Sequence, residues 1–249
     1  MTRLHRWRFG LTTAAATAGV LVTCALGIWQ LSRAADKLAL QAGIEASRAA
    51  PLLVNGDLAD LRDARAAQHR PVRLRGRWIG PWTVYLDNRP MSGRVGFYVV
   101  TPLELEGSGA VVLVQRGWAP RNFVDRAVLP AIQTPAGAVQ IEGRMALAPA
   151  RLYELPGAGA PLQQQGFAVI RQNLDLGAFA AETRLPLTGF TVLQTGPASE
   201  GLQRDWPQPA AGVDKHYGYA FQWFGLAGLI LVLYVWFQFI AARRNARRS

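Results

Sequence analysis

The stretch HYGYAFQWFGLAGLILVLYVWFQFIAA, residues 216–242, decides the fold because it contains no charged residue. A second uncharged stretch, FGLTTAAATAGVLVTCALGIWQLS, occupies residues 9–32 near the other end of the chain. At about 1.5 Å per residue, a helix over either stretch crosses a hydrocarbon core of about 30 Å. We therefore expect an integral membrane protein with two transmembrane helices, at residues 9–31 and 216–241.

The positive charge of the chain gathers beside these two stretches. The formal net charge is +11. Arginines without acidic neighbours occupy the two tails, at Arg3, Arg6 and Arg8 and at Arg243, Arg244, Arg247 and Arg248. Short basic flanks stay on the cytoplasmic side of a membrane and suit anionic lipids. The charge therefore predicts cytoplasmic tails at residues 1–8 and 242–249 and a non-cytoplasmic, periplasmic domain at residues 32–215. The partner it predicts is the lipid bilayer, and no nucleic acid.

Cys24 is the only cysteine of the chain, and it lies within the first stretch. No intramolecular disulfide can form, so the domain between the spans has to rely on its own core. Two processing alternatives stay open. Residues 9–31 could be a cleaved signal peptide, although Trp29-Gln30-Leu31 is a poor context for cleavage. Residues 21–24 faintly resemble a lipoprotein site, although the threonine before the cysteine is bulky for one.

The segment between the spans begins with helix-forming residues and then changes to strands. Residues 32–50 are rich in Ala, Leu, Lys and Glu, and Pro51 ends the predicted helix. Residues 55–70 predict a loop with a short helix. Alternating or β-branched apolar runs predict strands at 72–78, 83–87, 95–105, 111–118, 139–146, 167–172 and 190–194. Gly/Pro turns between them favour a mainly antiparallel β domain that closes into a sandwich or barrel, and residues 202–213 predict a linker.

His216 is an ionisable residue at the start of a span, which makes it a candidate functional residue. On a helix that begins near Lys215, His216, Tyr219 and Trp223 lie on one stripe at i, i+3 and i+7. An imidazole beside flat aromatic surface suits iron porphyrin, which needs an axial ligand and an apolar wall. The alternative is an aromatic belt at the membrane surface, where Tyr, Trp and His are common.

Common catalytic motifs are missing from the sequence, which has no glycine-rich phosphate loop, no G-x-S-x-G elbow and no HExxH. Only His69 and His216 lie outside the cytoplasmic tail, so no site of several histidines and cysteines can be assembled outside the membrane. Catalysis by paired carboxylates stays open. We expect a protein that is not an enzyme.

Gln30, Arg33 and Lys37 share one helical face, which we interpret as a solvated face at the headgroup level.

Four stretches of the sequence, in order, resemble segments of one protein family. They are LGIWQLSR (26–33) with Lys37, LDNR (86–89) with Gly96 and VTPL (100–103), VQRGWAP (114–120), and HYGYAFQWF (216–224). Together with the two spans, they make the chain similar to the Surfeit locus protein 1 family of cytochrome c oxidase assembly factors. Gln115 and Ala119 depart from the family pattern, in which asparagine and valine are usual.

The resemblance implies an assembly factor for haem-copper cytochrome c oxidase in respiratory chain biogenesis. Such a chaperone-like protein would bind haem a and support its insertion into the large, haem-bearing oxidase subunit. The haem a synthesis machinery is a further implied partner, and the bacterial inner membrane is the implied location. Two rival interpretations remain. One is a membrane-anchored interaction module that stabilises the oxidase subunit without haem, and the other is a membrane-anchored enzyme.

The resemblance implies that His216 ligates the haem iron. Tyr219 and Trp223, which share its stripe by helical spacing, would then lie against the porphyrin. Arg89 and Arg116 could meet the haem propionates, because a planar guanidinium suits carboxylates. Alternatively, these two arginines pair with acidic residues of the protein.

Overall fold

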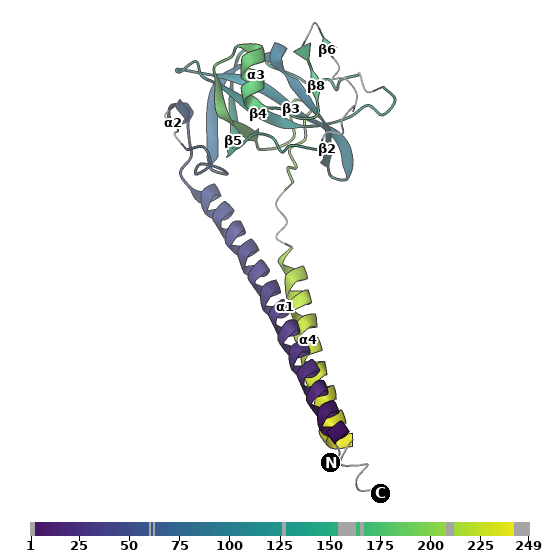
Figure 1. Ribbon diagram of the computed structural model, residues 1–249. Helices are drawn as coiled ribbons and strands as arrows, with labels where there is room; N and C mark the ends of the chain where they lie inside the picture. The colour runs from purple at the N-terminus through teal and green to yellow at the C-terminus, as the bar shows by residue number, and fades with distance from the viewer. Residues whose placement is uncertain are drawn as a thin grey trace. The chain divides into compact units, whose positions relative to one another are not determined.

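The computed structural model describes residues 3–59, 61, 63–125, 128–153, 163–164, 167–207 and 212–241 (Figure 1). The chain divides into two compact units. Residues Met1–Gly43 and Pro209–Ser249 form the helical unit, and Ile44–Gln208 form the β unit. The helical extension predicted at residues 32–50 therefore belongs mostly with the helical unit. The predicted cytoplasmic tail at 242–249, with its four arginines, lies outside the described residues.

The helical unit consists of α1 (Arg3–Ala49) and α4 (Val213–Val235), which continues as the π-helical η2 (Trp236–Ala241). Two segments, Trp7–Ala49 and Val213–Ile240, are long and apolar enough to cross a membrane. α1 runs through the first uncharged stretch without a break and ends two residues before Pro51, as the sequence predicts. α4 begins at Val213, slightly earlier than predicted.

α1 and α4 pack antiparallel, because residues early in α1 meet residues late in α4. The close approaches join Thr12 to Gln238, Thr13 to Tyr234, Gly19 to Ile230 and Gly27 to Phe224. A Cβ atom at Gly27 would lie 2.7 Å from Cζ of Phe224, so only glycine leaves room for the ring there. Small residues at such points let two helices approach closely in a membrane, where no hydrophobic driving force draws them together.

The β unit contains a seven-stranded sheet that closes on itself. Its strands run in the order β1 (Pro71–Trp78), β5 (Ala138–Ala146), β9 (Leu187–Gln194), β4 (Val111–Pro120), β3 (Arg94–Leu105), β2 (Val84–Met91) and β8 (Ile170–Arg171). β1 also pairs with β3, which closes the ring β1-β5-β9-β4-β3 into a barrel. Gly76 lies at this closure, where a Cβ atom would be 2.2 Å from the carbonyl oxygen of Glu104.

Most strand pairs are antiparallel, as the sequence predicts. The exceptions are β4 with β9 and β2 with β8, which are parallel. The predicted strand at 167–172 is split into β7 (Phe167–Ala168) and β8, and β7 pairs with the short β6 (Gln163–Gln164). The predicted strand at 83–87 is longer and turns at Ser92-Gly93 into β3.

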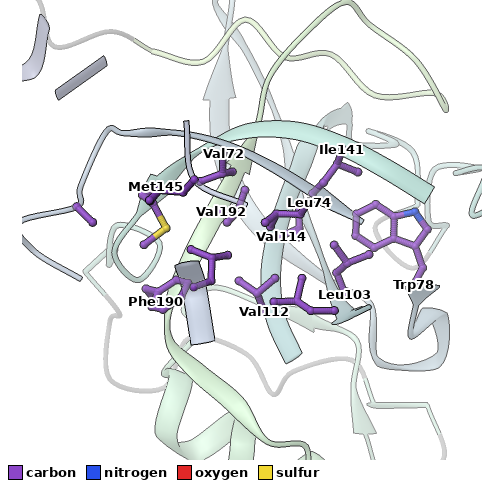
Figure 2. Packing of buried hydrophobic residues seen from close by; sticks show 14 residues of the cluster. Val72, Leu74, Trp78, Leu103, Val112, Val114, Ile141, Met145, Phe190 and Val192 are labelled. Carbon is purple, nitrogen blue, oxygen red and sulfur yellow. The ribbon is translucent and has the colours of Figure 1, made fainter. Parts of the chain in front are cut away.

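The barrel interior is filled by alternate residues of its strands (Figure 2). Val72, Leu74 and Trp78 of β1 point inward, whereas the arginines between them are exposed. The same cluster contains Val112 and Val114 of β4, together with residues of β3, β5 and β9. Period-two alternation in β1 thus reflects a strand with one buried and one solvated face.

β4 does not alternate, because both of its faces are covered. Leu113 packs into a second cluster with Phe179 of α3 (Leu176–Thr183), a helix that the sequence did not lead us to expect. Asp175 caps this helix by accepting a hydrogen bond from the backbone N–H of Ala178. The other short helices are α2 (Asn55–Ala59), in the loop where a short helix was predicted, and the 3-10 turn η1 (Gly80–Trp82).

Candidate functional site

His216 lies in the first turn of α4 and is half-buried against α1. Its Nδ1 atom is 2.7 Å from Oε1 of Gln30 on α1. A carboxamide oxygen can only accept a hydrogen bond, so this contact requires a proton on the ring nitrogen. In that tautomer of the neutral imidazole, Nε2 carries the lone pair that a metal ion would use.

The hydrogen bond lies on the faces along which the two helices pack. Gly27, one turn before Gln30, meets Phe224 of α4. Ala34 lies one turn after Gln30 and is 0% exposed, and Ala220 lies one turn after His216 and is 2% exposed. Small neighbours on both sides therefore keep the helices close enough for the two polar side chains to meet.

Tyr219 and Trp223 share the stripe of α4 that begins at His216, because the helix is continuous from Val213 to Val235. The side chain of Tyr219 is 51% exposed, and Trp223 is half-buried. An imidazole and two aromatic rings thus follow one another along one side of a helix. Such a surface can lie against a flat apolar ligand, and it equally suits an aromatic belt.

Trp29, Arg33 and Lys37 lie near Gln30 on α1, and their side chains are exposed. Trp29 is 51% exposed, and the guanidinium carbon of Arg33 lies 5.7 Å from the centre of its ring. Arg33 also pairs with Asp36 at 3.7 Å, with both side chains more than half exposed. Arg33 therefore lies on a solvated surface, whereas Gln30, which we had assigned to the same solvated face, is turned toward α4.

Arg116 lies in β4, and its side chain is fully buried in the β unit. Nη2 donates to Glu200 at 2.9 Å and to the carbonyl oxygen of Gln133 at 2.7 Å, and Nη1 donates to Thr134 at 2.8 Å. The guanidinium carbon lies 4.6 Å from the centre of the Trp78 ring. These contacts match the alternative in which Arg116 pairs with an acidic residue of the protein.

Arg89 lies in β2 and is 3% exposed. Its Nη1 and Nη2 donate to the carbonyl oxygens of Ala150 and Gln172, at 2.6 Å and 2.8 Å. Its own carbonyl oxygen accepts from the indole of Trp118 at 2.8 Å. Burial lowers the pKa of Arg89, and the nearby Tyr98 opposes that shift. Arg89 thus joins loops to the barrel, in the β unit, whereas His216 belongs to the helical unit.

Known proteins are similar to this chain over the stretch that contains these residues. The model of the SURF1 family matches residues 18–228. The chain belongs to the SURF1 family. A SURF1-like protein of Rickettsia felis is 28% identical over 86% of this chain and 91% of its own length. Surfeit locus protein 1 of Rattus norvegicus is 33% identical over 40% of this chain and 37% of its own, and that of Homo sapiens 32% over 40% and 38%.

The SURF1 match includes every candidate residue that the sequence predicts, and the recognised family resemblance is confirmed. It spans the helical unit from within α1 to within α4 and the whole β unit. Among the described residues, no group of three or more His, Cys, Asp or Glu side chains could together hold a metal ion.

Gln30 is the residue of this site that sequence reasoning missed. Helical spacing places Gln30 on one face with Arg33 and Lys37. Spacing alone does not tell whether that face contacts solvent or another helix. The sequence does carry a signal for this contact. A face of α1 that packs on another helix is marked by small residues three or four positions apart, here Gly19, Thr23 and Gly27. Gln30 continues the same spacing, which places it on the packed face.

Proposed function

We propose that this protein is an assembly factor for haem-copper cytochrome c oxidase that binds haem a through His216. The observation that carries the proposal is the hydrogen bond of 2.7 Å between Nδ1 of His216 and Oε1 of Gln30. Histidine ligands commonly donate the other ring N–H to a fixed acceptor, which sets the tautomer and the orientation of the ring. His216 has this arrangement before any ligand is considered.

The surroundings of His216 also fit a porphyrin. Haem iron takes its four equatorial nitrogens from the porphyrin, so the protein has to supply axial ligands and an apolar surface. Tyr219 and Trp223 offer aromatic surface on the same stripe of α4. Haem supplies redox-active iron when bound, and the chain's own residues hold and orient it, with no turnover chemistry of their own.

The family and the two apolar helices support the remaining parts of the proposal. The protein crosses the bacterial inner membrane twice, with both termini in the cytoplasm and the β unit in the periplasm. It holds haem a for the large oxidase subunit, and the haem a synthesis machinery supplies the haem. Both Nη atoms of Arg89 and of Arg116 already donate to groups of the β unit, so we place the propionates against other groups.

The test is purification of the full chain from cells that make haem a. The wild-type protein is expected to carry haem a, and His216→Ala is expected to accumulate in the membrane with its haem lost or its spectrum clearly altered. Trp223→Ala should change the spectrum less, because it removes aromatic surface beside the porphyrin and keeps His216 as the axial ligand. His69→Asn is the matched control, since it removes the histidine of the β unit. An unchanged haem a spectrum in His216→Ala would refute the ligand assignment.

A second candidate function is an interaction module that stabilises the oxidase subunit without haem. One observation favours it. Phe123, Val124 and Val128, in the segment between β4 and β5, are 69%, 98% and 50% exposed. Under this proposal, Phe123→Ser with Val124→Ser should reduce co-purification of the large oxidase subunit. Under the haem proposal alone, the same change should leave both the haem and the co-purified subunit as in wild type.

A further inference from the structure

We infer that Gln30 is a positioning residue for His216, fixing the imidazole as the Nδ1–H tautomer so that Nε2 faces the ligand. The inference rests on the proposed function for the identity of that ligand, an iron porphyrin. The tautomer itself is a property of the protein alone. Nδ1 and Oε1 are 2.7 Å apart, which is a short distance for a hydrogen bond between nitrogen and oxygen.

The packing around Gln30 explains why its carboxamide stays in place. Gln30 lies between Gly27, which contacts the Phe224 ring, and the fully buried Ala34. A polar side chain on a packed, largely apolar helix face is costly to leave without a partner, and His216 is the partner across it. The pair thus holds itself together, and the ring of His216 cannot turn without breaking it.

The tautomer decides which nitrogen can bind iron. If Nδ1 keeps its proton, only Nε2 has a free lone pair, and the hydrogen bond makes that nitrogen a stronger donor. If Gln30 were removed, the ring could rotate and both tautomers would be populated. Loss of such a partner typically lowers metal affinity by about 10–100-fold. We expect a change of that size for haem, with the fold intact.

The first measurement uses the full chain in detergent without haem. Nitrogen-15 NMR of labelled histidine distinguishes the two tautomers, at alkaline pH where imidazoles are neutral, and His216→Ala identifies the signals. Wild type is expected to show protonated Nδ1 and unprotonated Nε2. Gln30→Leu should give a mixture, and Gln30→Glu should keep the wild-type tautomer, because a carboxylate also accepts. Ser32→Leu, at an exposed position of α1, is the control and should match wild type.

The second measurement is titration of each variant with haem a, followed by resonance Raman of the bound iron. Gln30→Leu should bind about 10–100-fold more weakly and shift the iron–histidine vibration, while Gln30→Glu should retain binding. If wild-type His216 is protonated at Nε2, or Gln30→Glu loses the tautomer, the amide donates instead and the inference is wrong. If Gln30→Leu does not fold, Gln30→Glu and the wild-type tautomer still decide.

The two proposals fail in different ways. A wild-type protein with protonated Nδ1 that binds no haem a would overturn the proposed function and leave the tautomer inference standing. A protein that binds haem a through His216 equally well in wild type and Gln30→Leu, with the same vibration, would overturn the inference alone.

Discussion

Replacing Glu200 by glutamine removes its buried ion pair with Arg116 and its longer ion pair with Arg204, at 3.5 Å. The charged atoms of Arg116 and Glu200 are 2.9 Å apart, and their side chains are 0% and 21% exposed. At an effective dielectric constant of about 20, that distance corresponds to about 6 kcal/mol of attraction. Glutamine keeps the shape and an acceptor, and Arg116 keeps its bonds to Gln133 and Thr134. The expected loss is therefore about 3 kcal/mol, at the low end for breaking a buried pair.

The assay is thermal unfolding of the full chain in detergent, followed by the β-sheet circular dichroism signal. For a domain of this size, a loss of about 3 kcal/mol lowers the midpoint by about 6–12 °C. Glu142→Gln is the matched control, because Glu142 pairs with Arg73 at 3.0 Å with side chains that are 61% and 49% exposed. An exposed pair contributes about 0–1 kcal/mol. Equal midpoint shifts in the two variants would refute the reasoning, since burial would then make no difference.

Three further predictions concern topology, helix packing and pH. A reporter active only in the cytoplasm should work at Ser249 and fail in the turn at Gly107, and activity at Gly107 would reverse the topology. Gly27→Leu should reduce the yield of monodisperse protein on size exclusion, because its side chain displaces the Phe224 ring, and Phe224→Ala should restore the yield; no loss would mean that the helices separate easily. Burial and the nearby Arg144 and Arg48 lower the pKa of His69 below its ordinary value of about 6.5, so the unfolded chain takes up the proton first. The unfolding midpoint should then fall as the pH drops through about 6.5, and less so in His69→Asn; identical pH profiles would contradict this.

The sequence predicts the β unit well wherever one strand face is solvated. β1 alternates between buried apolar residues and exposed arginines, and its bounds differ from the prediction by one residue. Strand pairing cannot be predicted in the same way, because the local pattern of a strand carries no information about which strands lie beside it. The parallel pairing of β4 with β9 joins strands far apart in the chain, and nothing in either strand encodes its partner's direction. α3 was missed because it is short, although Asp175 and the alanines after it are a usable start signal.

The candidate site divides in the same way. His216 was found from sequence because a polar residue at the start of an uncharged run is unusual in itself. Gln30 was misassigned because its partner lies on the other helix, and the contact depends on how the two helices are aligned along each other. Arg116 stood out for its family motif, but only the fold brings Glu200, from a distant loop, to its guanidinium.

Two polar side-chain pairs, one near each end of the packed faces, fix how α1 and α4 are aligned along each other. Thr13 Oγ1 and the Tyr234 hydroxyl are 2.8 Å apart near one end, and Gln30 and His216 meet near the other. From Thr13 to Gln30 is 17 residues, about 26 Å of helix, and from His216 to Tyr234 is 18 residues, about 27 Å. The two lengths agree, so both polar pairs form at once, and a slip of one turn, about 5.4 Å, would break both. The orientation of His216 therefore depends on residues about 26 Å away along the helices, and variants at Thr13 or Tyr234 should be counted among those that can disturb it.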